Sequence, residues 1–194
     1  MLERPPSPPP DLASRGLPIE KIDAGGSFYR IHQTAYGAKF FGSTGLWRFD
    51  SPTKAFGTMY AGLSPGVAFA ETLIRGRGSL VAMSEIKMRS LCRFQVSRPI
   101  RLVKMFGPAM TKLQAAADVT TGEVAISQLW AQAFHDHPEQ PDGILYRSKY
   151  DNDEFAVALF ERCRASVDGG TTQRLIDDHK LLGSILDRYE LGLV

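Results

Sequence analysis

Arginine, glutamate and serine side chains interrupt four segments that are otherwise largely apolar. Arg30 lies within "FYRIH", Arg48 within "LWRF", Glu71 within "AFAETLI" and Ser148 at the end of "GILYRS". A guanidinium stays charged at any biological pH, so it needs water or an anion. A carboxylate on an apolar surface is costly unless it is paired or used. These positions are therefore the first candidates for chemistry.

The segment "TGLWRFDSP" (44–52) places an arginine between two large aromatic residues. Side chains of a β-strand alternate between its two faces. If this segment is a strand, Trp47 and Phe49 share the packed face. Arg48 then points the opposite way, toward a cleft.

Glu71 follows a strong helix start, with Ser64 as N-cap and Pro65 at the first helical position. A helix turns about 100° per residue, which puts Glu71 about 40° from Val67 and about 60° from Ile74. The glutamate then lies on the apolar side of the helix. Either it has a function or it forms a partly buried ion pair with Arg48 or Arg30.

Other common catalytic patterns find no support in the sequence. Ser148 has no G-x-S-x-G elbow around it. His135 and His137 are two residues apart, which does not place both on one helical face as a metal pair would require. Cys92 and Cys163 have no metal-ligand or redox spacing, so we expect two buried, reduced thiols in a cytoplasmic protein.

Charge is unevenly distributed along the 194 residues, although the net charge is only +2. Residues 72–117 carry nine Lys and Arg against one acid, Glu85, whereas residues 118–194 carry fourteen acids against seven bases. Such a basic segment suits an anionic ligand or an acidic partner, or it is simply a solvated strand face. Few aromatic residues lie among these bases, so we expect no direct nucleic-acid binding. No apolar run is long enough to cross a membrane.

The first eighteen residues contain six of the twelve prolines. This composition predicts a flexible, proline-rich arm over residues 1–21 and one catalytic domain over 22–194. Because the N-terminal segment has no apolar core, we expect it not to be a secretion signal peptide.

The predicted elements after the arm are short strands mixed with helices. Strands are expected at 27–33, 45–49, 57–62, 80–88, 91–96, 99–106, 143–148 and 155–161. Helices are expected from Pro65 to Gly76, over most of 109–136 with a break near 120–122, and over 173–190. Because no βαβ rhythm is present, the fold class is α+β with largely antiparallel strands.

Taken in order, these residues resemble the RES domain family, which is named for its arginine, glutamate and serine. The likeness covers residues 27–161 and rests on "FYRIH", "GLWRFDSP", "GTMYAGLSPGVAFAETL" and "GILYRSKYDN". Its most specific part is the ordered series Arg48, Tyr60 and Glu71. Asp50 departs from the pattern, since the family usually has asparagine there.

The resemblance implies an ADP-ribosyltransferase-like fold, with a split antiparallel β core, surrounding helices and a cleft that holds NAD. It also implies the toxin of a bacterial toxin–antitoxin pair, whose partner is an Xre-like antitoxin that blocks the cleft. Family members degrade NAD by hydrolysis or phosphorolysis, or transfer its ADP-ribose to a protein acceptor. NAD is then a substrate, and neither a metal nor a prosthetic group is needed.

Within this resemblance each residue has a physically sensible task. Arg30 and Arg48 clamp the pyrophosphate, and Tyr60 stacks on the nicotinamide ring. Glu71 stabilises the positive charge that develops on the ribose, and Ser148 orients the nicotinamide side or a phosphate.

Two other functions remain open from the sequence. The same site could serve a protein ADP-ribosyltransferase, since the acceptor is selected by other surfaces. Alternatively, the chain is a non-catalytic module whose basic segment binds an acidic protein or RNA, with Glu71 merely paired.

Overall fold

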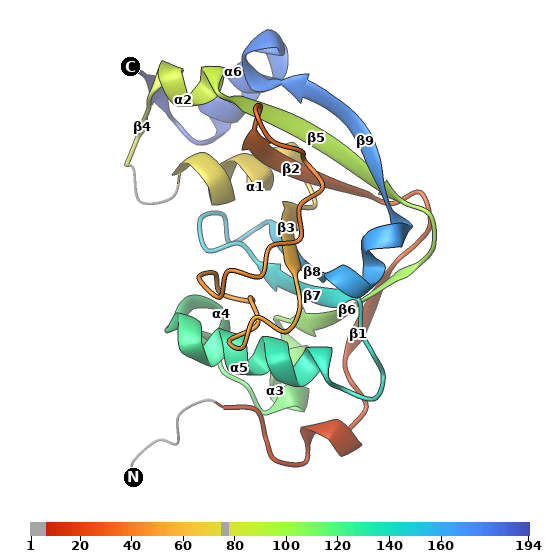
Figure 1. Cartoon of the computed structure of the whole chain (residues 1–194). Helices are drawn as coiled ribbons and strands as arrows, with labels where there is room; N and C mark the ends of the chain where they lie inside the picture. Colours follow the sequence, from red (N-terminus) through yellow and green to blue (C-terminus); the bar gives the residue numbers. More distant parts are fainter. Residues whose placement is uncertain (1–6, 75–77) are drawn as a thin grey trace.

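The computed structural model describes residues 7–74 and 78–194. Within these residues, eight strands form one sheet in the order β1-β6-β7-β8-β3-β2-β5-β9 (Figure 1). The strands are β1 (Ile19–Ile22), β2 (Ser27–Gln33), β3 (Thr58–Gly62), β5 (Arg89–Val96), β6 (Ile100–Met105), β7 (Gly143–Arg147), β8 (Phe155–Phe160) and β9 (Val167–Arg174). Neighbouring strands are antiparallel except β6 and β7. The predicted α+β class is confirmed.

The sheet is split between β2 and β3, because these strands share one register pair, Tyr29 with Gly62. By contrast, β2 pairs with β5 along its whole length, from Ser27 to Gln33. Figure 1 shows β2, β5 and β9 in one half of the molecule and β6, β7 and β8 in the other, with β3 between them. This is the predicted split antiparallel core.

The helices cover both halves of the sheet. They are α1 (Pro65–Phe69), a π-helical segment (Ala70–Ile74), α2 (Met83–Lys87), α3 (Pro108–Leu113), α4 (Asp118–Thr121), α5 (Val124–His135) and α6 (His179–Arg188). Three 3₁₀ turns, η1 (Leu12–Ser14), η3 (Glu161–Ser166) and η4 (Leu175–Asp177), and a small parallel pair, β4 (Leu80–Val81) with β10 (Gly192–Leu193), complete the fold. In the described part of the chain, no helix has the length and apolar character that a membrane span requires.

Most predicted strands are present, but the one at 80–88 is wrong. That segment forms the two-residue β4 and then α2. A short apolar run fits either period, and here Ile86 is buried as part of a helix. The helix predicted over 173–190 is present only as α6, because β9 continues to Arg174. The helices predicted over 109–136 are present, with the break at Gly122.

Strand β9 was not predicted, because its sequence "VDGGTTQR" is polar and buries only Val167. It forms by pairing with β5, where the register shifts between Arg93 and Gln95. A Cβ on Gly170 would lie 1.4 Å from the Arg93 carbonyl oxygen. Gly170 thus permits the two backbones to approach closely. This contact between distant segments is visible only in the tertiary structure.

The packed part of the chain begins well before residue 22, so the predicted arm over 1–21 is wrong from Leu12 onward. Leu12 and Leu17 are buried in the same core cluster as Trp130 and Phe134, and β1 pairs with β6. Prolines limit regular structure in this segment, but the leucines between them still bury apolar area. Residues 1–6 lie outside the described residues.

This packing gives a stability prediction. Leu17→Ala removes a buried side chain, and we expect it to lower the free energy of unfolding by about 2–3 kcal/mol. Leu80→Ala is the matched control, because Leu80 is exposed. Denaturant unfolding of both variants checks this, and equal stability for the two would contradict a packed N-terminal segment.

Cys92 and Cys163 are buried free thiols, as predicted. Cys92 lies on β5 and Cys163 lies in η3. Burial raises the pKa of the Cys163 thiol to about 12. The thiol therefore stays protonated and unreactive at physiological pH.

Candidate active site

A pocket of about 770 Å³ opens where the sheet splits between β2 and β3. Four of the five predicted site residues line it: Arg30, Arg48, Tyr60 and Glu71. They come from β2, the loop before β3, β3 itself and the segment after α1. The split of the sheet is therefore what brings these distant positions together.

Glu71 reaches the pocket through the predicted helix start and an unpredicted change of helix type. The Ser64 hydroxyl caps α1 by accepting a hydrogen bond from the Val67 amide at 3.2 Å. After Phe69 the helix continues as a π-helical segment that carries Glu71. The regular helical angles assumed from the sequence therefore do not apply there, and π-helical turns are frequent at functional sites. The predicted helix end at Gly76 lies outside the described residues.

Glu71 is held by the chain after β7. Its Oε1 accepts hydrogen bonds from the Ser148 hydroxyl at 2.6 Å and from the Lys149 amide at 3.2 Å. Among the described residues, both hydrogen bonds to this carboxylate go to Oε1. The alternative of an ion pair with Arg48 or Arg30 is wrong, since neither guanidinium forms a salt bridge with Glu71 in the described structure.

Ser148 does not line the pocket. It is 2% exposed, and its oxygen also accepts hydrogen bonds from the Tyr150 and Asp151 amides. The predicted direct contact with a ligand does not fit this burial. The contacts of Ser148 make it a support for Glu71 instead.

The segment 44–50 is a tight loop, so the predicted strand at 45–49 is wrong. Trp47 is 44% exposed and Phe49 is fully buried, so the two aromatic rings do not share a face. The physical reason is Asp50, whose Oδ2 accepts hydrogen bonds from the Leu46 and Trp47 amides. A carboxylate that binds the preceding amides in this way stabilises a turn in place of an extended chain.

Arg48 extends from this loop to the junction of α4 and α5. Its Nη1 donates to the Gly122 carbonyl at 2.9 Å and to the Ser127 hydroxyl at 3.0 Å. These bonds tie the loop to the helices on the far wall of the pocket. Arg48 therefore does face the cleft, as predicted, although from a loop.

Arg30 is a partly buried arginine of the pocket. Its Nη1 donates to the carbonyls of Ala38 at 3.0 Å and Phe40 at 2.8 Å. Desolvation by burial lowers the pKa of this guanidinium from its usual value. Arg30 thus holds the loop after β2 while it lines the pocket.

Tyr60 presents its ring to the pocket and its hydroxyl to the loop. The hydroxyl donates to Asp50 Oδ1 at 2.9 Å and accepts from the Phe49 amide at 2.9 Å. Burial, followed by the charge of Asp50, raises the pKa of this phenol well above its usual value. Tyr60 therefore stays protonated and couples the position of its ring to the loop that carries Arg48.

The sequence did not reveal several residues of the site. Asp50 is the clearest, since it is 1% exposed and connects Tyr60 to the loop. The sequence feature that could have indicated its role is the aspartate at position 50, where the family usually has asparagine. Arg89, Glu123, Lys149 and Tyr150 also line the pocket, and nothing in their local sequence indicated this. No group of three or more His, Cys, Asp and Glu side chains among the described residues is arranged to hold a metal ion.

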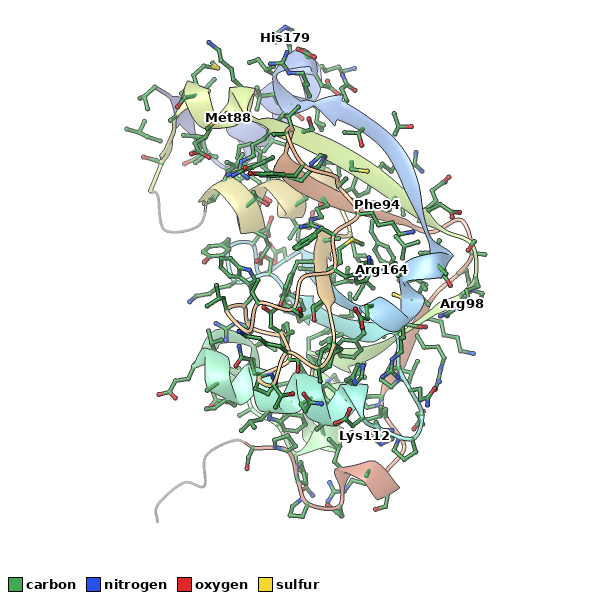
Figure 2. The ribbon with its side chains drawn as sticks, viewed as in Figure 1. Met88, Phe94, Arg98, Lys112, Arg164 and His179 are labelled. Carbon is green, nitrogen blue, oxygen red and sulfur yellow. The ribbon has the colours of Figure 1, made fainter. Side chains whose placement is uncertain are left out.

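The basic segment 72–117 is partly neutralised within the protein. The ion pairs between described residues of this segment and the rest of the chain or each other include Arg89 with Glu85, Arg98 with Asp142, Arg101 with Glu139 and Lys104 with Glu20. Figure 2 shows Arg98 on the side of the molecule away from α1 and α4. Arg75 and Arg77 lie outside the described residues. This pairing does not favour a surface built to bind an acidic partner.

Comparison with a family model described as RES domain gives a match over residues 27–178. The chain belongs to the RES domain family. It is also 25% identical over 126 residues to the "Probable toxin y4kH" of Sinorhizobium fredii, a match that covers 64% of this chain and 98% of that protein.

A solved structure resembles this RES domain. One chain of the M. tuberculosis MbcT–MbcA toxin–antitoxin complex matches with a TM-score of 0.65 and 14% identity, covering 84% of this chain and 92% of that chain. At this level of identity the likeness is one of fold alone. α6 (His179–Arg188) lies beyond the residues that the family model matches.

Proposed function

We propose that this RES domain is the toxin of a toxin–antitoxin pair and that it cleaves the nicotinamide–ribose bond of NAD, by hydrolysis or phosphorolysis. Membership of the RES family supports the enzyme class. The similarity to a probable toxin and to a chain of a toxin–antitoxin complex supports the biological role. The proposed partner is an Xre-like antitoxin that blocks the pocket, and the proposed location is the cytoplasm, where the two free thiols stay reduced.

The observation that carries this proposal is the state of the Glu71 carboxylate. Glu71 lines the pocket, and both of its hydrogen bonds in the described structure reach one oxygen, Oε1. The second oxygen is then left to act on a ligand. A fixed, charged carboxylate beside a ribose is the group that a glycosidic cleavage requires.

The chemistry needs little beyond this carboxylate. The C–N bond between ribose and nicotinamide breaks, and its electron pair neutralises the pyridinium nitrogen. Nicotinamide leaves as a neutral molecule, so no general acid is required. The ribose carbon becomes positive, Glu71 stabilises that charge, and water or phosphate then forms the new C–O bond, with release of a proton.

Arg30 and Arg48 suit the negative pyrophosphate of the same substrate. Each guanidinium carries five N–H donors, and the bonds to protein described above occupy only some of them. Charge-assisted bonds from the remaining donors would fix the dinucleotide across the pocket. Tyr60, on β3, also lines the pocket. In this proposal its ring packs on the nicotinamide.

The decisive experiment is to mix purified protein with NAD and measure free nicotinamide. Release in plain buffer indicates hydrolysis, release that depends on phosphate indicates phosphorolysis, and release that depends on a cell extract indicates ADP-ribosyl transfer to a protein. No release under any of these conditions would reject NAD cleavage and leave a non-catalytic binding module.

Arg48→Ala should weaken NAD binding at least tenfold, because it removes a cation from the pocket and releases the 44–50 loop from Gly122. Isothermal titration with NAD, using a Glu71→Gln background to prevent turnover, measures this. Arg164→Ala is the control, since Arg164 is exposed in η3. Equal NAD affinity in both variants would contradict the role of Arg48 as a clamp.

A further inference from the structure

We infer that Arg188 and Tyr189, at the C-terminal end of α6, are positioning residues for Glu71. They fix the chain between β7 and β8, residues 148–154, which we call the carboxylate loop. This loop in turn holds Glu71. The inference rests on the proposed function for its catalytic consequence, but the structural link can be tested without it. Both residues lie beyond the family match, which ends at residue 178.

The first half of the link is the contact between α6 and the carboxylate loop. Asp151 Oδ2 accepts hydrogen bonds from the Tyr189 hydroxyl at 2.6 Å and from Arg188 Nη2 at 2.9 Å. Arg188 Nη1 also lies 2.9 Å from Glu154 Oε1. Arg188 thus binds both Asp151 and Glu154, and Tyr189 binds Asp151. These two acidic residues stand at the ends of a tight turn, in which the Glu154 amide donates to the Asp151 carbonyl.

The second half of the link runs from the loop to Glu71. Asp151 and Tyr150 donate their amides to the Ser148 oxygen. Ser148 then donates its hydroxyl to Glu71 Oε1, and the next amide, Lys149, binds the same oxygen. In the described part of the chain, every hydrogen bond to the Glu71 carboxylate therefore comes from this loop. A shift of the loop moves the carboxylate directly.

We call the contacts of Arg188 and Tyr189 with Asp151 and Glu154 the latch. Glu154 connects this latch to the start of the helix that leads to Glu71. Its Oε2 accepts a hydrogen bond from the Ser64 hydroxyl at 3.2 Å, and Ser64 is the N-cap of α1. The carboxylate and the start of its helix are thus both connected to Arg188. Lys149 and Tyr150 also line the pocket, so the loop contributes part of the wall as well as the support.

The latch is separable from the packing of α6. Leu182 and Ile185 bury the apolar face of this helix against the core, whereas the Arg188 side chain is 46% exposed. Removing the Tyr189 hydroxyl leaves the ring in place. We therefore expect small losses of stability from Tyr189→Phe and Arg188→Gln, but a loosened carboxylate loop.

The experiment compares Tyr189→Phe and Arg188→Gln with two matched controls, Tyr36→Phe and Arg164→Gln, which alter exposed side chains away from the pocket. Hydrogen exchange followed by mass spectrometry reports on residues 148–154, and NAD turnover gives kcat and KM. We expect faster exchange in that loop and a kcat about tenfold lower in both latch variants, with KM changed less than about threefold. The controls should match the wild type.

Two further variants separate positioning from general damage. Asp151→Asn keeps an oxygen that accepts from Tyr189 and Arg188, so it should retain most of the turnover that Asp151→Ala loses. Unchanged exchange and unchanged kcat in Tyr189→Phe and Arg188→Gln would overturn the inference, as would equal losses in Asp151→Asn and Asp151→Ala.

A failure of the proposed NAD cleavage can be distinguished from a failure of the positioning inference. If the wild type releases no nicotinamide, the proposed function fails, and the exchange rates of residues 148–154 still decide whether the latch exists. If the wild type is active but the latch variants behave like the controls, only the positioning inference fails.

Discussion

Glu71→Gln should bind NAD and fold normally yet lose turnover by a factor of about 10²–10³, which is the usual cost of removing one preorganised electrostatic group. The substitution changes the charge of residue 71 and leaves its hydrogen bonds in place. Glutamine keeps an Oε1 that can accept from the Ser148 hydroxyl and the Lys149 amide, so the support from the carboxylate loop is retained. Only the negative charge of Glu71, which we propose acts on the ribose, is removed.

Nicotinamide release gives kcat, titration with NAD gives affinity, and thermal unfolding checks the fold. Glu123→Gln is the matched control, because Glu123 also lines the pocket but takes no part in the proposed chemistry. We expect it to stay within about threefold of wild type. Turnover of Glu71→Gln within tenfold of wild type, or an equal loss in both variants, would reject Glu71 as the catalytic carboxylate.

Asp50→Ala should cause the largest loss of stability among single substitutions near the site. The buried carboxylate accepts hydrogen bonds from the Thr44 hydroxyl, the Leu46 amide, the Trp47 amide and the Tyr60 hydroxyl. Alanine leaves these donors without their acceptor, and we expect a loss of about 2–3 kcal/mol. The midpoint of thermal unfolding should then fall by roughly 5–10 °C. Activity should fall as well, because Arg48 and Tyr60 both depend on this residue.

Asp50→Asn is the informative companion variant. Asparagine keeps one oxygen for the loop amides and can turn its NH₂ group toward the Tyr60 oxygen, so we expect a loss below about 1 kcal/mol. It is also the residue expected from the family pattern. If Asp50→Ala were as stable as Asp50→Asn, the hydrogen bonds described above would not be what holds the loop.

The sequence predicted the parts of the site that local patterns determine. Tyr60 and Arg30 lie within short segments that were predicted as strands between glycine-containing connections, and Glu71 follows a helix start defined by Ser64 and Pro65. Patterns of this kind predict the type of an element and its position along the chain. Combined with the family resemblance, they were enough to predict that these three residues share one pocket.

Other features depend on contacts between distant segments, which no local pattern contains. The loop at 44–50 forms because Asp50 is bound by Tyr60, and β9 forms because Gly170 lets two backbones approach. Ser148 was predicted to contact the ligand, whereas its burial behind Glu71 is a property of the packed structure. Tertiary contacts override local preference in each of these cases.

The single residue pair between β2 and β3 has a mechanical consequence. We expect the two parts of the sheet to bend at the Tyr29–Gly62 pair, because only this backbone pairing would be distorted while the longer ladders on either side stay intact. Helix α1, which contacts both β2 and β3, also connects the two parts. If the chain cleaves NAD as proposed, we expect the pocket between the two parts of the sheet to widen as the dinucleotide enters and as its fragments leave. If the sheet bends in this way, a protein inhibitor could insert into the widened pocket between β2 and β3.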